Sequence, residues 1–584
     1  MIMKIRNIKY ILLGLLSMSF CSCLNLQPQD QLGGDKMWTS VSDYKNFANN
    51  FYTWTTDFSS IYNDGSPHSD SRSDLLTYQT VNIYSKGTNT VPTSDGNYTS
   101  DYNHIRRTNL LLQNAANYSR PEDINEYVGE AYFFRAYSYF DLLELYGNVL
   151  IIKKSIDVTD TAMNAARNDR SDVADFIIDD LNNAINDLPS NSELTSDQNG
   201  RVCKEAAEAL LSRVALYEGT WQKFHNNNLD RAKKLLNISA NAAKLVIDSK
   251  QFYLFGTQGS SEALGDSAQK YMFILEDEKS NPAGLQKSSN HEYILARRHD
   301  QTILPIGKNI TKEVVNNVQW ITRNFANMYL CSDGLPIDKS PLFHGYNKKV
   351  SEFLNRDNRM HYTLLMPGTY YWTNSNPRET WVWNTDIKPN GGNGIIYAGG
   401  GNGSGYNNQK WGTERDVEST YEGYDYPVIR YAEVLLNYAE AVYEKDGAIS
   451  DADLDISLNL VRMRANQNMP KLSNSFVTAN VLDMRTEIRR ERTIELYQEG
   501  FRIDDLKRWG TAVQVMNQPL LGVEYAGTEY QTNWGSTIAP TQNKDENGCL
   551  IMDANRQWSD KDYLYPIPSD QLQLDPKLKQ NPGW

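Results

Sequence analysis

Three long segments that share a pattern of small and aromatic residues constrain the fold more than any other feature of the sequence. The segments GEAYFFRAYSYFDLLELYG, CKEAAEALLSRVALYEG and IRYAEVLLNYAEAVYEKDG occupy residues 129–147, 203–219 and 429–447. In each of them small residues allow two helices to approach closely, while Tyr and Leu fill the groove between them. Such self-similarity predicts helical hairpins stacked on one another, and it places Cys203 in their core.

Apolar residues recur at three and four positions over most of the chain, which is the period of an amphipathic helix. The spacing favours a mainly α fold of tetratricopeptide-like helical pairs, with polar loops between the helices. We expect the helical scaffold to span about 40–56, 101–280 and 424–515. The individual helices are expected at 101–118, 121–146, 171–188, 202–221, 229–248, 429–445, 452–465 and 480–512.

Two long stretches, about 57–100 and 281–423, interrupt the helical pattern. They are rich in Gly, Asn, Ser, Pro and aromatic residues, and loops of that length in a compact protein are usually functional. We predict an irregular, loop-rich region there that carries a few short strands and binds the ligand, followed by a C-terminal segment at 516–584. The glycine-rich run at 390–412 lacks the Lys-Ser/Thr ending of a phosphate-binding loop, so we interpret it as a surface loop.

Aromatic residues are abundant, with 36 Tyr, 12 Trp and 17 Phe, and many fall in these two stretches. A flat ring stacks on the C–H face of a sugar, while neighbouring Asp, Asn and Arg side chains hydrogen-bond its hydroxyls. The run YYWTNSNPRETWVW at 370–383 alternates the two kinds of residue. Packing inside the loops is the alternative for each ring taken singly. The candidate ligand-binding residues are Asp70, Arg72, Tyr78, Tyr84, Trp320, Tyr371, Trp372, Arg378 and Trp383.

Several classes of function lack support in the sequence. The net charge of −14 repels phosphate backbones, so we predict no nucleic-acid partner. The seven His residues form no HExxH pair, and the sequence contains no GxSxG motif. We therefore predict no catalytic residue, no metal site and no cofactor.

Four glutamates, Glu487, Glu491, Glu495 and Glu499, recur every four residues and form the richest carboxylate cluster. A carboxylate pair could serve a glycosidase, but like charges at this spacing repel one another unless cations lie nearby. Because arginines surround the stripe, we predict a charge network between packed helices, with at least one Glu paired to an Arg from a distant helix. The candidate partners are Arg135, Arg213 and Arg430.

The N-terminus has the pattern of an export signal. Lys4, Arg6 and Lys9 precede an apolar stretch at 10–20 that is too short to cross a bilayer as a stable anchor. We therefore predict a lipoprotein signal peptide at 1–22.

A small residue stands directly before Cys23, as in the bacterial lipobox, whose Cys becomes the lipidated first residue of the mature protein. Cys21 is the alternative, with Phe before it. Each methylene of a lipid chain contributes about 0.8 kcal/mol when buried in the bilayer, so several chains hold a protein on a membrane. We predict lipidation of Cys23, followed by a polar tether at 23–39.

Six segments, in this order, resemble the SusD/RagB family of outer-membrane nutrient-binding lipoproteins. The resemblance spans nearly the whole chain. The segments are Cys23 with the QPQDQ that follows it, GEAYFFRAYSYFDLLELYGNVLII (129–152), YLCSDGLPID (329–338), RYAEVLLNYAEA (430–441), IRRERTIELYQEGFRIDDLKRWG (488–510) and YLYPIPSDQLQLDPKLKQNPGW (563–584).

This resemblance implies one SusD-like domain at 40–584 in a lipid-anchored protein of the outer membrane that faces the cell exterior. It implies a protein that captures oligosaccharides and delivers them to a partner TonB-dependent (SusC-like) transporter, without breaking a bond. The family motifs transfer no ligand-binding residue, so the candidates above rest on composition. Two alternatives stay open: a protein of the same fold that binds peptide or another nutrient, and a secreted glycosidase.

Overall fold

The computed structural model describes residues 37–584 except 62–64, 79, 81, 156–164, 316–318, 368–369, 373–379, 383–402, 416–417, 419 and 535–542. Cys23, the expected signal peptide and most of the expected tether lie outside the described residues. Within these limits, none of the helices combines the length and the apolar character that a membrane-spanning segment needs.

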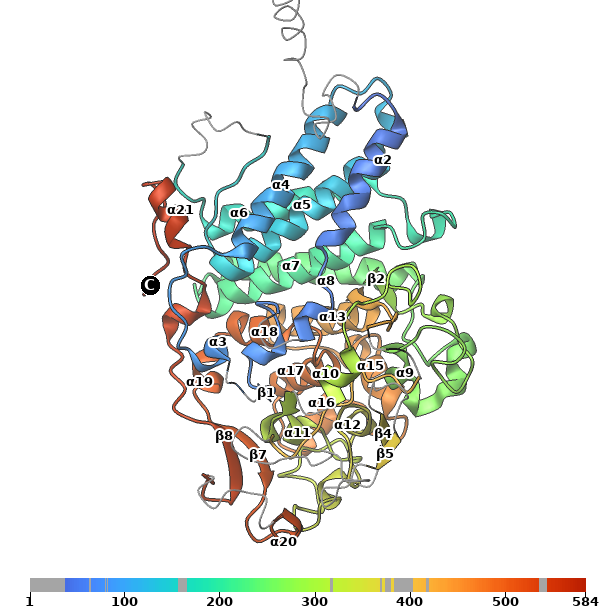
Figure 1. The fold of residues 1–584 in the computed structure, drawn as a ribbon, viewed down its shortest axis with the longest axis vertical. Helices are drawn as coiled ribbons and strands as arrows, with labels where there is room; N and C mark the ends of the chain where they lie inside the picture. The colour runs from blue at the N-terminus through green and yellow to red at the C-terminus, as the bar shows by residue number, and fades with distance from the viewer. Residues whose placement is uncertain are drawn as a thin grey trace, which may run out of the picture.

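The N-terminal half folds into long antiparallel helices that pack consecutively, α4 on α5, α5 on α6, α6 on α7 and α7 on α8 (Figure 1). Close approach is possible because a Cβ atom on Gly129 would lie only 2.8 Å from Leu188, and one on Gly219 only 3.0 Å from Leu236. The predicted helical pairs are confirmed, and Cys203 is buried among them. The helices are α2 (Val41–Asn49), α4 (Gly96–Ala115), α5 (Asn125–Tyr146), α6 (Arg170–Asp187), α7 (Lys204–Phe224) and α8 (Leu229–Ser249).

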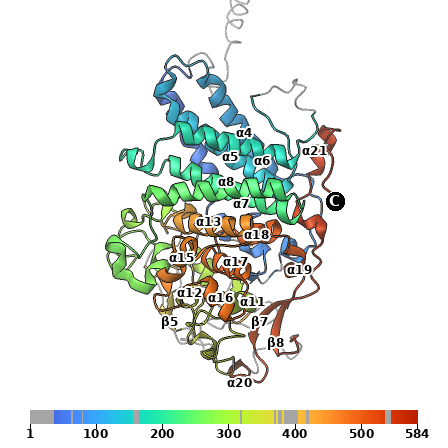
Figure 2. The same cartoon turned by 180° about the vertical axis from the view of Figure 1, so that it is seen from behind.

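A second group of helices lies under this layer and continues the stack, because α13 packs on α7, α8 and α17 (Figure 2). The single helix expected at 480–512 is instead two, since the chain turns at Gln498 and Gly500, both with positive φ. The segment expected at 452–465 is also divided. The elements are α13 (Tyr431–Asp446), α14 (Asp451–Asp455), α15 (Leu458–Ala465), α16 (Asn474–Ala479), α17 (Met484–Glu495), α18 (Arg502–Arg508) and α19 (Ala512–Met516).

The loop-rich region carries a few short strands, as predicted, and further short strands follow it in β6 and in the C-terminal segment; all of them pair in two-stranded antiparallel sheets. The pairs are β1 (Leu76–Tyr78) with β3 (Gln319–Ile321), β2 (Tyr293–Arg297) with β6 (Tyr426–Arg430), β4 (Tyr370–Trp372) with β5 (Thr380–Val382), and β7 (Leu520–Glu524) with β8 (Cys549–Asp553). The short helices are α3 (Ile83–Lys86), α9 (Ala268–Met272), α10 (Ile310–Val315), α11 (Arg323–Met328), α12 (Asn358–Thr363), α20 (Glu529–Trp534) and α21 (Ser569–Leu574).

The loop-rich region has its own core, which is rich in aromatic residues. Trp411 is 1% exposed and stacks on Tyr426, with ring centroids 5.5 Å apart and planes at 16°. Phe58, from the first loop stretch, packs edge-on against both rings. Many loop aromatics therefore serve to pack the loops, which is the alternative that the sequence left open.

A buried charge network joins the loop-rich region to the helices. The guanidinium of Arg430 contacts Glu499 at 2.6 Å, Glu495 at 2.7 Å and Glu292 at 2.8 Å, and Arg430 itself is 2% exposed. The predicted pairing of the glutamate stripe with a distant Arg is confirmed for this residue. The other two suggested partners are wrong, because Arg135 and Arg213 pair with other carboxylates, Asp180 and Glu433.

The network is balanced in formal charge and extends over several elements. Burial alone would raise the pKa of Glu495, but the guanidinium groups around it lower that pKa below its usual range. The carboxylate of Glu495 is thereby kept ionised in the interior. The cations are Arg359, Arg430, Arg462, Arg464 and Lys410, and the carboxylates are Glu292, Asp357, Glu491, Glu495 and Glu499.

We predict that Glu495→Gln lowers the free energy of unfolding by about 3 to 5 kcal/mol, because it leaves buried guanidinium groups without their counter-charge. Urea unfolding followed by circular dichroism measures this change. Glu262→Gln, at an exposed position, is the control and should stay within about 0.5 kcal/mol of the parent chain. Equal effects of the two substitutions would contradict a structural role for the network.

Candidate ligand-binding groove

The first loop stretch places its candidate Asp70 and Arg72 in the interior. Asp70 is fully buried and accepts a hydrogen bond of 2.5 Å from the backbone N–H of Gln498, and burial raises its pKa to about 7. Arg72 donates to the hydroxyl of Tyr565 at 2.6 Å, and its guanidinium lies 3.8 Å from the ring centre of Tyr84. Asp70 and Arg72 thus anchor the loop on the helices, and neither offers a surface to a bound sugar in this structure.

Tyr78 and Trp320 lie on the paired strands β1 and β3 and are also buried, with exposed fractions of 8% and 2%. The hydroxyl of Tyr78 donates to the backbone carbonyl of Ile61 at 2.7 Å. Neither ring forms an exposed stacking platform, so we do not carry these two residues, nor Asp70 and Arg72, into the site proposed below.

The remaining candidates are scattered. Tyr84 is half-buried under Arg72. Tyr371 and Trp372 belong to β4, where they pair with Trp381 and Thr380 of β5. Arg378 and Trp383 lie outside the described residues.

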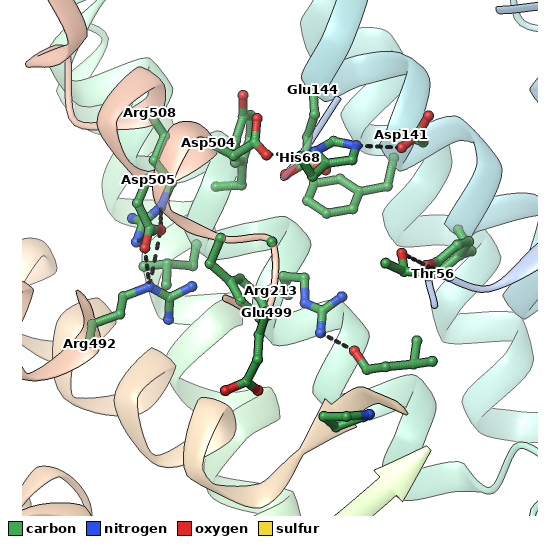
Figure 3. Close-up of a pocket in the computed structure, with 18 of the residues that line it drawn as sticks. Thr56, His68, Asp141, Glu144, Arg213, Arg492, Glu499, Asp504, Asp505 and Arg508 are labelled. Atoms are coloured by element: carbon green, nitrogen blue, oxygen red, sulfur yellow. Dashed lines mark hydrogen bonds and ion pairs between the residues drawn. The ribbon is translucent and has the colours of Figure 1, made fainter. Parts of the chain in front are cut away.

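An enclosed polar cavity lies where α5 and α7 meet β6 and the α17–α18 turn (Figure 3). His68 is held between Asp141 and Asp504, with both ring nitrogens 2.6 Å from a carboxylate oxygen. Burial alone would lower the pKa of His68, but the two carboxylates raise it well above its usual value. The ring is therefore a cation fixed in the wall of the cavity.

Glu144 faces the same cavity, and both burial and the nearby Asp504 raise its pKa well above the usual range. A carboxyl group whose pKa lies well above that of a neighbouring carboxyl group is a feature of acid–base catalysis. However, the cavity holds only about 70 Å³, whereas pockets for small organic ligands typically measure about 300 to 1,000 Å³. It has room for a few water molecules and none for a sugar ring.

A much larger groove, of about 1080 Å³, opens on the surface beside α11, α17, α18, α19 and β7. We call it the α11–α17 groove. Amide, guanidinium, aromatic and aliphatic side chains all line it, and a wet site for a polar ligand requires both polar and apolar groups. Its walls include Asp74, Arg323, Asn324, Asn327, Tyr346, Arg489, Arg490, Trp509, Gln514, Gln518, Glu524 and Asp545.

Helical periodicity brings these side chains together. On α17, Thr486, Arg489, Arg490 and Thr493 are three or four residues apart and share one face. The helix begins after Asp483, whose carboxylate accepts a hydrogen bond from the backbone N–H of Thr486 at 2.9 Å. The cap at Asp483 fixes where the helix begins, and the helical period then places Arg489 and Arg490 in the groove.

The opposite wall is preorganised by Tyr346. The guanidinium of Arg323 lies 3.8 Å from the centre of the Tyr346 ring and contacts Glu524 at 3.0 Å. The Tyr346 hydroxyl donates to the amide oxygen of Asn327 at 2.9 Å. That bond fixes the amide of Asn327, which lines the groove.

The carboxylates of the groove in the described part of the chain already have partners. Asp74 is paired with Arg502 at 2.8 Å, and Glu524 with Arg323. Asp545 accepts backbone N–H groups within its own turn. A general acid or nucleophile needs a carboxyl group open to the substrate, and these three are occupied. Among the described residues, no three His, Cys, Asp or Glu side chains are arranged to hold a metal ion.

Sequence reasoning missed this groove because it is shared between three parts of the chain: α11 and Tyr346 lie in the expected loop-rich region, α17 in the expected helical scaffold and β7 in the C-terminal segment. The signal present in the sequence is the polar face of 486–493, which continues through Gln514 and Gln518. A polar face of that kind is usually only solvated, so it indicated no site until the neighbouring elements were placed.

We predict that the stability contributed by His68 falls as pH rises above about 6.5, its usual value in an unfolded chain. Because the folded-state pKa is raised, the contribution is fully present below that pH. It then declines by up to about 1.4 kcal/mol per pH unit until the folded-state pKa is reached. Urea unfolding of the parent chain and of His68→Gln at pH 6 and pH 8 measures it.

The stability difference between these two proteins should be smaller at pH 8. His344→Gln, which changes an exposed histidine, should show the pH dependence of the parent chain. A His68→Gln difference that is the same at both pH values would mean that His68 is neutral in the folded protein.

Two family models together match most of the described chain. A model of the SusD family matches residues 275–584. A second model, described as "Starch-binding associating with outer membrane", matches residues 34–216. Among curated proteins, a SusD-like protein of Bacteroides ovatus is 33% identical over 94 residues, which make up 16% of this chain and only 16% of that protein.

Solved structures share the fold over nearly the whole chain. A SusD-like carbohydrate binding protein of Bacteroides fragilis has a TM-score of 0.71 at 22% identity, covering 93% of this chain and 99% of that one. A surface glycan-binding protein A of Bacteroides fluxus has a TM-score of 0.58 at 19% identity, covering 94% and 100%. Because the first family model alone covers more than half of the sequence, the chain belongs to the SusD family.

Proposed function

We propose that this protein binds glycans at the outer membrane without cleaving them, and that the α11–α17 groove holds the oligosaccharide. The observation that carries this proposal is the groove itself. Its volume of about 1080 Å³ exceeds the usual range for one small ligand and suits a chain of several sugar rings.

The chemistry of the groove supports a sugar ligand. Hydroxyls removed from water must regain hydrogen-bond partners, and the groove offers both donors and acceptors on Asn327, Gln514 and Gln518. Gln514 and Gln518 are exposed, so a ligand can reach them without rearrangement of the fold. Tyr346 adds a half-buried ring to the wall that carries Asn327.

A binding role, rather than hydrolysis, is favoured by the state of the carboxylates. Each of the three in the groove accepts charge-assisted or backbone hydrogen bonds. Glu144, whose pKa is raised well above the usual range, lies in a cavity too small for a sugar. Glycosidases need an acid and a base or nucleophile on the two sides of the scissile bond.

Location and partner belong to the same proposal. The second family model associates the N-terminal half with starch binding and the outer membrane, and the sequence before residue 37 carries a lipobox-like Cys23. We propose a lipid anchor on Cys23, exposure to the cell exterior, and delivery of oligosaccharide to a TonB-dependent (SusC-like) transporter.

We predict that the purified chain binds at least one member of a glycan panel in affinity electrophoresis, with no release of reducing ends. Gln514→Ala combined with Gln518→Ala should weaken that binding roughly tenfold or more, since each lost neutral hydrogen bond costs about 1 kcal/mol. Isothermal calorimetry measures the change in affinity.

Gln113→Ala, at an exposed position on α4 remote from the groove, is the matched control and should bind like the parent chain. Failure to bind any glycan, or turnover of one, would refute the proposal. Tight binding of a peptide instead would support a nutrient-binding protein with a different cargo.

A further inference from the structure

We infer that the α11–α17 groove selects glycans that carry an anionic substituent, a uronate carboxylate or a sulfate ester, through the guanidinium groups of Arg489 and Arg490. This inference rests on the proposed glycan-binding function and names the class of sugar. Four arginines line the groove, and two of them, Arg323 and Arg502, are matched one to one by groove carboxylates.

Arg489 lacks a carboxylate of its own. Its nearest one, Glu444, is 3.6 Å away and is already contacted at 2.7 Å by both Lys223 and Arg485. Glu440 also attracts Arg489 but is already paired with Arg508 at 2.6 Å, so Arg489 shares each of its two nearby carboxylates with other cations. Nε and Nη2 of Arg489 have no hydrogen-bond partner among the described residues, although a guanidinium out of contact with water needs one.

Arg490 is also under-satisfied. Its contacts are long: Nε and Nη2 lie 3.3 Å and 3.4 Å from the two carboxylate oxygens of Glu487, and Nη1 lies 3.4 Å from the backbone carbonyl of Met328. The Nε contact does not have the geometry of a hydrogen bond. Arg489 and Arg490 are adjacent on α17 and line the same groove. The side chains of Arg489 and Arg490 keep exposed fractions of 16% and 17%. An oxyanion in the groove would bind at these exposed parts, since a guanidinium binds carboxylate or sulfate through paired N–H groups.

A fixed aromatic ring orients Arg489. The guanidinium lies 4.6 Å from the centre of the Trp509 ring, and the indole N–H of Trp509 donates to Glu440 at 2.6 Å. Because the ring is anchored, the guanidinium loses little further freedom when it binds an anion. The neighbouring amide side chains can then form hydrogen bonds with the hydroxyls of the same sugar ring.

The net charge of the whole chain indicates that the groove recognises an anion through local contacts. A protein with a net charge of −14 repels anions at long range, so a positive groove on it works at short range only. Contacts of this kind remain sensitive to screening, because the Debye length shortens to about 3 Å at 1 M salt. Added salt should therefore weaken the binding of acidic ligands and leave the binding of neutral ligands unchanged.

The test is calorimetry of the purified chain with two matched pairs of probes. One pair is an oligogalacturonate and its carboxyl-reduced neutral form, and the other is a carrageenan-derived oligosaccharide, whose only anionic groups are sulfate esters, and its desulfated neutral form. We expect at least one acidic probe to bind ten times more tightly than its neutral partner. The pair in which this occurs tells whether carboxylate or sulfate is recognised.

Arg489→Gln and Arg490→Gln, alone and together, should abolish the preference and leave the affinity for the neutral probe within about twofold. Arg489→Lys keeps the charge but loses the planar fork and should be intermediate. Arg106→Gln is the matched control, because it removes one positive charge at an exposed position on α4 and does not line the groove. Circular dichroism checks the fold of each variant. If the Arg489 variants do not fold, the result for Arg490→Gln alone tests the selectivity.

The outcomes separate the two claims. Equal binding of acidic and neutral probes, or a preference that survives in both arginine variants, overturns the anionic selectivity and leaves glycan binding intact. Binding of none of the probes nor of any glycan in the wider panel overturns both.

Discussion

Arg430 is the point at which the helical pairs and the loop-rich region meet. It ends β6, which pairs with β2, and directly precedes α13, which packs on α7 and α8. Its guanidinium contacts Glu292, Glu495 and Glu499 in the interior. Such a group adds little stability relative to apolar packing, but an arrangement that leaves one charge unpaired is strongly disfavoured. The network therefore acts mainly by restricting which segments can come together.

The helical scaffold can be predicted well from the sequence because each helix depends on residues that are close together in the chain. Alanine, glycine and aromatic spacing within 129–147 or 203–219 already specifies a helix and its packing face. The glutamate stripe could also be interpreted correctly, since four carboxylates at helical spacing demand cations. The helix expected at 480–512 was wrong for a local reason as well: Gln498 adopts a positive φ beside Gly500, and the turn carries Glu499 to Arg430.

The ligand site could not be predicted in the same way, because it depends on contacts between distant segments. Asp70 and Trp320 have the residue types of a sugar site, yet Asp70 bonds to the backbone of Gln498, and Trp320 is buried on a strand paired with β1. Conversely, Arg489 and Gln514 belong to helices with no composition that marks a site. Only the placement of α11 and β7 opposite α17 converts a polar helix face into a groove.

The two faces of α17 connect stability with the proposed function. One face carries Glu491 and Glu495 into the balanced interior network, whereas the other carries Arg489 and Arg490 into the groove. Because these glutamates are taken up by Arg359, Arg430, Arg462 and Arg464, they are unavailable to the groove arginines of their own helix. Of the four glutamates in the stripe, Glu487 pairs with the groove residue Arg490, and among the described residues Arg489 has no ion-pair partner on its own helix. A change of ligand preference requires only the groove face to vary, and the charges that join the two regions stay as they are.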